Sequence, residues 1–310
     1  MKKILPPLLI VLSVFLGVYF LNQKDIKEEK EVLAVASFYP LFDLTSKVGG
    51  ERINVINLTP YGVDPHEFEP SLRDISNIEK ADIFLYNGAG LDPWAEKKGK
   101  ELGEKGVIVL NMSSYFNLLE GNNQHHEDEE DNHHHKEDPH IWLDPLIMKE
   151  MINIILDNLI EIDPSGEKYY RKNAEEIIIL FEELDQEYQN ELSNCRLGGI
   201  VISHASIGYL AKRYNFEMIA ISGISPIEEP SAKKMAEITD IVKEEKINHI
   251  FFETTIPSNL AEIIAKETGA EVLVFNPVAS LTKKEIEEGK DYFSVMKDNL
   301  TKLETALDCE

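Results

Sequence analysis

Three histidines in this sequence stand in settings that suit metal binding. Two lie in Asp-Pro-His motifs, with His66 in the stretch DPHEFEP and His140 in the stretch DPHIWLDP. The third, His204, directly follows the apolar run 200–203. Zinc favours imidazole nitrogen, and three such ligands leave one open position in a tetrahedral site. We therefore predict that these three side chains converge on one divalent cation.

Residues beside two of these histidines could hold the rings in place. A proline precedes both His66 and His140 and restricts the backbone there. Asp64, Asp138 and Asp144 could each accept a hydrogen bond from the second nitrogen of a ligand ring, which would fix its tautomer. A single histidine of this kind could equally be a turn or cap residue, so it is the repetition that favours a metal site.

A second group of histidines lies in the stretch 121–137, which contains no apolar residue. Its acidic residues are interleaved with five histidines: His125, His126, His133, His134 and His135. Such a loop could collect divalent metal weakly, or it could be a disordered acidic spacer. The zinc-protease pattern H-E-x-x-H begins at His126 and at His66 but ends in Glu130 and Pro70, so it is incomplete at both places.

The overall charge and the missing motifs argue against several other functions. The chain has 31 Lys and Arg against 56 Asp and Glu, a net charge of −25. Nucleic-acid binding depends on basic patches, so nucleic acid is not an expected partner. The sequence contains no G-x-S-x-G, no G-x-G-x-x-G and no phosphate loop ending in Lys-Ser/Thr. We therefore predict that the protein is not an enzyme.

The elements that must position these residues alternate between strand and helix. Short apolar runs predict eight strands, at residues 32–37, 53–58, 83–87, 107–111, 199–203, 217–222, 249–253 and 271–275. Amphipathic stretches predict helices, at residues 41–49, 72–80, 93–104, 146–161, 165–194, 206–213, 231–245, 258–268 and 284–306. The alternation is typical of parallel sheets with helical crossovers. Ligands bind beyond the carboxyl ends of such strands, where His66 and His204 both fall.

The predicted fold class is α/β, with two lobes that each contain a central, mostly parallel sheet flanked by helices. We place the N-terminal lobe at residues 32–163, with the polar stretch 121–137 as a disordered loop inside it. One long helix at residues 164–194 joins it to a C-terminal lobe at residues 195–310. The metal site is then expected in the cleft between the lobes.

The first 31 residues predict export from the cytoplasm. Lys2 and Lys3 precede the uncharged run 4–21, which is typical of a secretory signal or an N-terminal membrane anchor. The run is about as long as a short membrane span. The segment Ala34–Ala36 has the form of a cleavage site but lies inside the first predicted strand. We favour an anchor that is not cleaved, with residues 1–31 as anchor and tether and the rest of the chain outside the cytoplasm.

The three histidine motifs, with the segment SHASIGYLAKRYN that begins at Ser203, resemble the metal-binding solute-binding proteins of zinc and manganese ABC importers. The similarity covers roughly residues 32–308 and includes the tail LTKKEIEEGKDYFSVMKDNLTKLETAL. It implies a monomer with a rigid connecting helix that binds one cation through His66, His140 and His204 and passes it to a membrane permease. In this family a histidine at the third position goes with zinc and a carboxylate with manganese, so zinc is favoured over manganese.

The resemblance leaves the fourth ligand open. Relatives commonly supply a carboxylate from the turn after the last strand, but here that turn reads Asn276-Pro277-Val278-Ala279-Ser280. The fourth ligand could be water, the side-chain oxygen of Asn276, or Glu253. The two cysteines, Cys195 and Cys309, lie at the start and the end of the second lobe. We expect them to form a disulfide in an oxidising compartment.

Two other functions are compatible with three histidines and a bound zinc ion. One is an extracytoplasmic zinc-dependent hydrolase, which would use a zinc-bound water together with a general base that we do not find. The other is a metal-containing adhesin, because cell adhesion is also associated with this family. Turnover that requires metal would indicate the hydrolase, whereas partner binding that survives loss of the histidines would indicate the adhesin.

Overall fold

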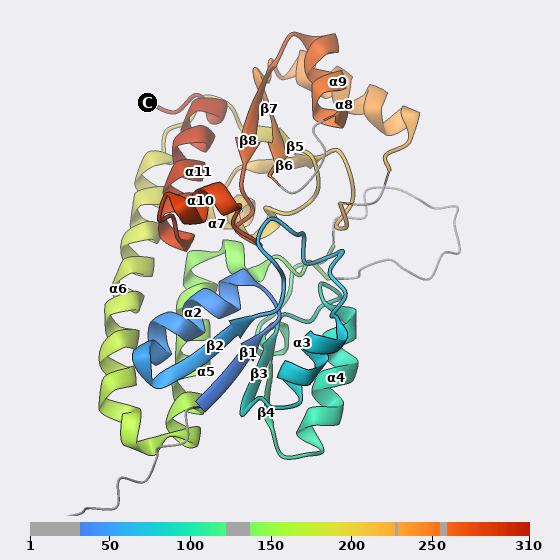
Figure 1. Ribbon diagram of the computed structural model, residues 1–310. Helices are drawn as coiled ribbons and strands as arrows, with labels where there is room; N and C mark the ends of the chain where they lie inside the picture. The colour runs from blue at the N-terminus through green and yellow to red at the C-terminus, as the bar shows by residue number, and fades with distance from the viewer. Residues whose placement is uncertain (1–31, 122–136, 227–228, 255–258) are drawn as a thin grey trace, which may run out of the picture. The chain divides into compact units, whose positions relative to one another are not determined.

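The computed structural model describes residues 32–121, 137–226, 229–254 and 259–310, and these residues contain two four-stranded parallel sheets (Figure 1). The two sheets confirm the predicted α/β fold with two lobes. Residues 32–310 form one compact unit. The finer division at residues 163 and 194 stays a prediction. The anchor and tether predicted for residues 1–31 lie outside the described residues.

The N-terminal sheet has the strand order β2-β1-β3-β4. Its strands are β1 (Val32–Ala36), β2 (Ile53–Asn57), β3 (Ile83–Tyr86) and β4 (Ile108–Asn111). The crossovers run through helices α2 (Tyr39–Gly49), α3 (Leu72–Ile78) and α4 (Pro93–Gly103). Short 3₁₀ turns, η1 (Gly50–Arg52) and η2 (Met112–Tyr115), follow α2 and β4. Because β1 pairs with both β2 and β3, loops leaving neighbouring strands diverge there and leave room for a ligand.

The C-terminal sheet repeats this arrangement in the order β6-β5-β7-β8. Its strands are β5 (Gly199–Ile202), β6 (Glu217–Ala220), β7 (His249–Glu253) and β8 (Glu271–Phe275). The helices of this lobe are α7 (Gly208–Tyr214), α8 (Ala232–Glu244), α9 (Asn259–Thr268), α10 (Lys283–Glu287) and α11 (Tyr292–Leu307). The same connectivity in both lobes gives two equivalent sets of loops at the carboxyl ends of the strands.

Burial explains why these apolar runs form parallel strands. Every residue of β3 (IFLY) and of β5 (GIVI) is buried, as expected for strands covered by helices on both faces. Each of the eight strands lies within its predicted range and ends at most two residues short of it, because a short continuous apolar run between turn residues is typical of a buried strand.

Helix α6 (Glu167–Glu191) connects the lobes, and the long helix α5 (Pro145–Ile162) of the first lobe leads into it. Helix α5 follows the 3₁₀ turn η3 (Ile141–Leu143), and a second turn, η4 (Pro164–Gly166), leads into α6. Helix α6 packs against α5 and α2 in the first lobe and against α11 in the second. Figure 1 shows α6 running along the side of both lobes. Among the described residues, no helix has the length and apolar character needed to span a membrane.

The prediction of one helix over residues 284–306 was wrong, because the structure has two. Helix α10 ends before Gly289, whose positive φ of 72° is a conformation that favours glycine. Asp291 then starts α11 with a capping box, in which its side chain accepts a hydrogen bond from the Ser294 N–H. The amphipathic pattern continues across the break, so periodicity alone did not reveal it.

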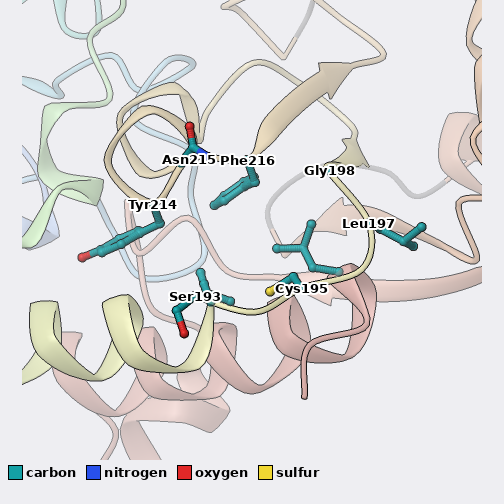
Figure 2. Close-up of a pocket in the computed structure, with 9 residues that line it drawn as sticks. Ser193, Cys195, Leu197, Gly198, Tyr214, Asn215 and Phe216 are labelled. Atoms are coloured by element: carbon teal, nitrogen blue, oxygen red, sulfur yellow. The ribbon is translucent and has the colours of Figure 1, made fainter.

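Cys195 and Cys309 are joined by a disulfide that connects the start of the second lobe to the end of α11. A cavity of about 350 Å³ lies beside it, and Figure 2 shows Cys195 on its wall with Tyr214 and Phe216. No histidine lines this cavity, so it is separate from the metal-binding motifs.

Candidate metal centre

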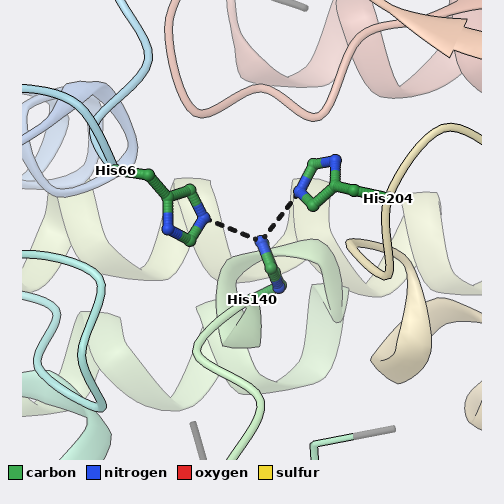
Figure 3. A group of neighbouring side chains, drawn as sticks. All are labelled: His66, His140 and His204. Carbon is green, nitrogen blue, oxygen red and sulfur yellow. Dashed lines mark hydrogen bonds between the residues drawn. The ribbon is translucent and has the colours of Figure 1, made fainter. Parts of the chain in front are cut away.

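The structure brings the three predicted histidines together (Figure 3). His66 lies in the loop after β2, His140 lies just before η3, and His204 follows β5. The Nε2 atom of His140 is 3.3 Å from Nε2 of His66 and 3.3 Å from Nε2 of His204. One ligand nitrogen from each ring lies within 4.8 Å of the other two. Residues far apart in sequence, from both lobes, therefore point at one small volume.

Two of the three spacings between these nitrogens match a tetrahedral zinc site. Zinc binds histidine nitrogen at about 2.0–2.1 Å, which places two ligands of a tetrahedron about 3.3–3.4 Å apart. The two contacts made by His140 have this length. Histidine nitrogens suit zinc better than manganese, which prefers oxygen. The geometry and the donor atoms thus favour the same ion.

The Asp-Pro-His motifs fold in the same way at both positions. Asp64 accepts a hydrogen bond from the backbone N–H of His66, and Asp138 accepts one from the backbone N–H of His140, each over 2.9 Å. This is an Asx turn, in which an aspartate side chain accepts a hydrogen bond from the backbone N–H two residues later. Asp138 Oδ1 also lies 2.8 Å from Nδ1 of His140, so this carboxylate holds both the backbone and the ring.

Asp144, the third aspartate of these motifs, has a different role from the one predicted. It caps α5, where its side chain accepts hydrogen bonds from the N–H groups of Leu146 and Ile147. It also accepts a hydrogen bond from Arg213 on α7. Asp144 therefore supports the helix that follows His140 and connects it to the second lobe.

The three rings differ in their access to solvent. His140 and His204 are 1% and 2% exposed, whereas His66 is half-buried. Burial also raises the pKa of Asp138 to about 7, against the opposing effect of the hydrogen bond from the His140 N–H. Burial would lower the pKa of His204, but the adjacent Glu253 carboxylate outweighs it and the pKa is raised. Of the three rings, His66 is the one that solvent reaches most readily.

The two side chains predicted as possible fourth ligands, Asn276 and Glu253, both contact other residues of the protein. The Asn276 side-chain oxygen accepts a hydrogen bond from the Val278 N–H, and its amide nitrogen donates to Glu285. Glu253 lies beside His204, where Oε1 is 2.7 Å from Nδ1, while Nε2 of the ring faces His140. Among the described residues, His66, His140 and His204 are the side chains whose possible ligand atoms lie close enough together to hold one metal ion.

The histidine-rich loop begins and ends near this site. Its five histidines, His125, His126, His133, His134 and His135, lie outside the described residues. The flanking residues Glu120 and Glu137 form an isolated antiparallel bridge, and the Asp138 N–H donates to the Leu119 carbonyl over 2.8 Å. Both ends of the loop therefore meet directly before Asp138-Pro139-His140.

Contacts between the lobes support the site and were not predicted from the sequence. The Tyr209 hydroxyl accepts a hydrogen bond from the Leu119 N–H and donates to the Asp138 carbonyl. The Ser280 hydroxyl, from the loop after β8, accepts a hydrogen bond from the Gly62 N–H in the loop that carries His66. These partners are 71–218 residues apart in sequence, so no local motif could have indicated them.

Comparison with known proteins supports this interpretation. Residues 34–306 match the family described as zinc-uptake complex component A, periplasmic. The high-affinity zinc uptake system protein ZnuA of Bacillus subtilis is 35% identical over 276 residues, which cover 88% of this chain and 86% of that protein.

Solved structures show the same similarity in three dimensions. Zn(II)-bound AdcA from Streptococcus pneumoniae has a TM-score of 0.77 and 35% identity, with 90% of this chain and 58% of that chain covered. The laminin-binding protein Lmb of Streptococcus agalactiae, described as a bifunctional adhesin and metal transporter, has a TM-score of 0.77 and 31% identity over 89% of this chain and 99% of its own.

The chain spans only part of some of these relatives. It covers 62% of the AdcA sequences and 58% of the AdcA structure, whereas it covers nearly all of Lmb. The match nevertheless includes both sheets and all three histidine motifs. The chain belongs to the zinc-uptake component A family, whose members are zinc-binding transport proteins and not enzymes.

Proposed function

We propose that this protein is the extracytoplasmic zinc-binding component of an ABC importer, which captures Zn²⁺ and delivers it to a membrane permease. The observation that supports it most strongly is the convergence of three histidine side chains from both lobes, with one ring nitrogen of each within 4.8 Å of the others. The membership in a zinc-uptake family supports the same function. Residues 4–21, proposed as a membrane anchor that is not cleaved, would keep the protein near its permease.

The proposed ligands are His66, His140 and His204, with water in the fourth position. Three protein ligands leave the fourth position of a tetrahedral zinc site to an exchangeable water, and protonation of the imidazoles would release the ion. A carrier needs such reversibility, since it must transfer its ion. The two other proposed ligands are disfavoured by their present contacts, because Asn276 bonds to Val278 and Glu285 and Glu253 faces the Nδ1 side of His204.

The auxiliary role proposed for residues 121–137 is to collect metal near the site. The ends of this loop meet beside Asp138, which places its base close to His140. The loop histidines would raise the local concentration of zinc without forming the tight site. The protein is proposed to act as a monomer.

The test is a calorimetric titration of the protein with zinc and with manganese, with and without residues 121–137. We expect one tight zinc site that survives removal of the loop, and much weaker binding of manganese. Loss of the tight site on removal of the loop would mean that the three histidines are not the main site.

A second candidate function is adhesion, because Lmb, a relative of similar length, is described as both adhesin and metal transporter. Binding to immobilised laminin would test it, with the His140→Ala variant as the comparison. Laminin binding that is retained in this variant would show adhesion independent of the metal, whereas no binding by the unmodified protein would leave zinc transport alone.

A further inference from the structure

Glu253 is a fully buried acid at the end of the central strand β7. Its exposed fraction is 0%, and β7 lies between β5 and β8, inside the second lobe. A buried carboxylate is costly unless it is paired with a charge or satisfied by hydrogen bonds. Such a residue in the middle of a sheet therefore needs a structural or functional partner.

The partners of Glu253 all belong to the segment that carries His204. Its Oε1 atom lies 2.7 Å from Nδ1 of His204. The hydroxyl of Ser206 donates to the same oxygen over 3.1 Å, and the hydroxyl of Ser203 lies at 3.4 Å. Three groups within four residues of one loop thus surround one carboxylate oxygen, although they lie 47–50 residues from Glu253 in sequence.

The position of the Glu253 carboxylate favours one tautomer of His204, and the tautomer determines which ring nitrogen has a lone pair that can bind metal. A neutral imidazole carries one N–H and one lone pair, so an acceptor at Nδ1 favours the proton there and leaves the lone pair on Nε2. Nε2 of His204 is the nitrogen that faces His140. Asp138 lies at Nδ1 of His140 in the same way, over 2.8 Å. Two of the three rings therefore have a carboxylate oxygen within 2.8 Å of Nδ1.

We propose that Glu253 is the positioning residue for His204, which it holds with Nδ1 protonated and Nε2 directed at the metal, without binding the metal itself. This inference rests on the proposed function, because it assumes that His204 is a zinc ligand. Partners of this kind typically change metal affinity 10–100-fold when they are removed. Glu253 would then set how tightly the second lobe holds the ion.

The test compares two substitutions of Glu253 with a control on the neighbouring strand. Glu253→Leu removes the acceptor at similar volume, whereas Glu253→Gln keeps an acceptor oxygen without the charge. Glu271→Gln is the control, since Glu271 is a largely exposed acid on β8. The tautomer of His204 is measured by ¹⁵N NMR on metal-free protein with labelled histidine, at a pH above the raised pKa of His204 so that the ring is neutral, and His204→Gln identifies its signals. Zinc affinity is measured by competition with a chelator, and thermal unfolding reports the fold.

We expect the unmodified protein and Glu271→Gln to show Nδ1–H at His204 with equal zinc affinity. Glu253→Leu should lose the single tautomer and bind zinc about 10–100-fold more weakly, and Glu253→Gln should keep the tautomer with a smaller loss. Unchanged tautomer and affinity in Glu253→Leu would overturn the proposal, as would Nε2–H at His204 in the unmodified protein. The latter measurement decides the question even if Glu253→Leu does not fold.

The NMR measurement also separates this inference from the proposed function. If the unmodified metal-free protein has Nδ1–H at His204 but binds no zinc at the three histidines, the transport proposal fails and the role of Glu253 in orienting the ring stands. If zinc binds at the three histidines while a Glu253 oxygen is found on the ion, the transport proposal stands and the positioning role is wrong.

Discussion

At the scale of single residues, His140 is the centre of the candidate site. Its Nε2 atom makes both of the 3.3 Å contacts with the other two rings, and its side chain is almost fully buried. The carboxylate of Asp138 holds its backbone N–H and lies at its ring Nδ1. A change at this position therefore affects the whole cluster more directly than a change at His66, which is half-buried.

We predict that His140→Ala lowers zinc affinity by more than about 100-fold, beyond the effect expected for loss of a supporting residue. Isothermal titration with zinc measures this change. His249→Gln is the matched control, because His249 lies on β7 outside the cluster, 3.9 Å from Glu271. Retention of tight zinc binding in a folded His140→Ala protein would contradict the proposed ligand set.

At the scale of elements, helix α7 connects the two lobes around the site. The helix begins four residues after His204, and its Tyr209 and Arg213 contact the segment that carries His140. Arg213 donates to Asp144, the N-cap of α5, and Tyr209 bonds to the Asp138 carbonyl. Two of the proposed ligands are thus linked through one short helix.

Removal of the Tyr209 hydroxyl should weaken this link. Tyr209→Phe leaves the Leu119 N–H and the Asp138 carbonyl without this partner, which costs about 1–3 kcal/mol for buried polar groups. We expect a lower free energy of unfolding and weaker zinc binding, measured by urea denaturation and calorimetry. Tyr115→Phe is the control, since Tyr115 is 51% exposed. Equal stability of the two variants would count against this role.

A second link between elements joins the turn after α2 to the turn before α6. Burial would raise the pKa of Asp163, but hydrogen bonds from Ser165 and Tyr170 and the guanidinium of Arg52 outweigh it and lower the pKa to about 2. Arg52 donates to Asp163 over 2.8 Å. Since a carboxyl in an unfolded chain has a pKa near 3.9, the ionised form stabilises the folded protein.

We therefore predict that Asp163→Asn costs about 1–2 kcal/mol at neutral pH, allowing for solvent screening. This contribution is fully present above about pH 5 and is lost as the pH falls toward 2, because the folded-state pKa lies below the unfolded one. Denaturation curves of both proteins, from pH 7 down to the lowest pH at which both fold, measure it. A stability difference that does not shrink on acidification would refute the interpretation.

At the scale of the whole molecule, α6 packs against both lobes and the disulfide joins the two ends of the second lobe. The bond between Cys195 and Cys309 closes a sequence separation of 114 residues. Backbone hydrogen bonds from Leu197 to the Leu307 carbonyl and from Arg196 to the Asp308 carbonyl run beside it. The last residues of the chain are thereby attached to the first residues of the second lobe.

Reduction of this disulfide should lower the free energy of unfolding by about 4–5 kcal/mol, because a loop of this length gains much conformational freedom in the unfolded chain. The double variant Cys195→Ser with Cys309→Ser should show the same loss. Zinc affinity should not change, since neither cysteine belongs to the three-histidine group. Urea denaturation and calorimetry measure the two quantities, and a matching loss of zinc affinity would show that the disulfide supports the site.

Much of this organisation could be predicted from the sequence. The strands were found because buried parallel strands are continuous apolar runs, and the histidines because their motifs repeat. The break between α10 and α11 was missed because the amphipathic residue pattern continues across Gly289, although the capping box at Asp291 starts a new helix there. The role of Asp144 as an N-cap was missed because the same aspartate could serve a ring or a helix end.

The sequence by itself determined the fold class and the three candidate ligands, since both depend on local residue types and their order along the chain. Only the tertiary structure decided which partners hold those ligands. Glu253 meets His204 from a strand 49 residues away in the sequence, and Tyr209 meets Leu119 from the other lobe. Such contacts depend on how sheets and loops pack in space, and no local pattern encodes the distance between two atoms.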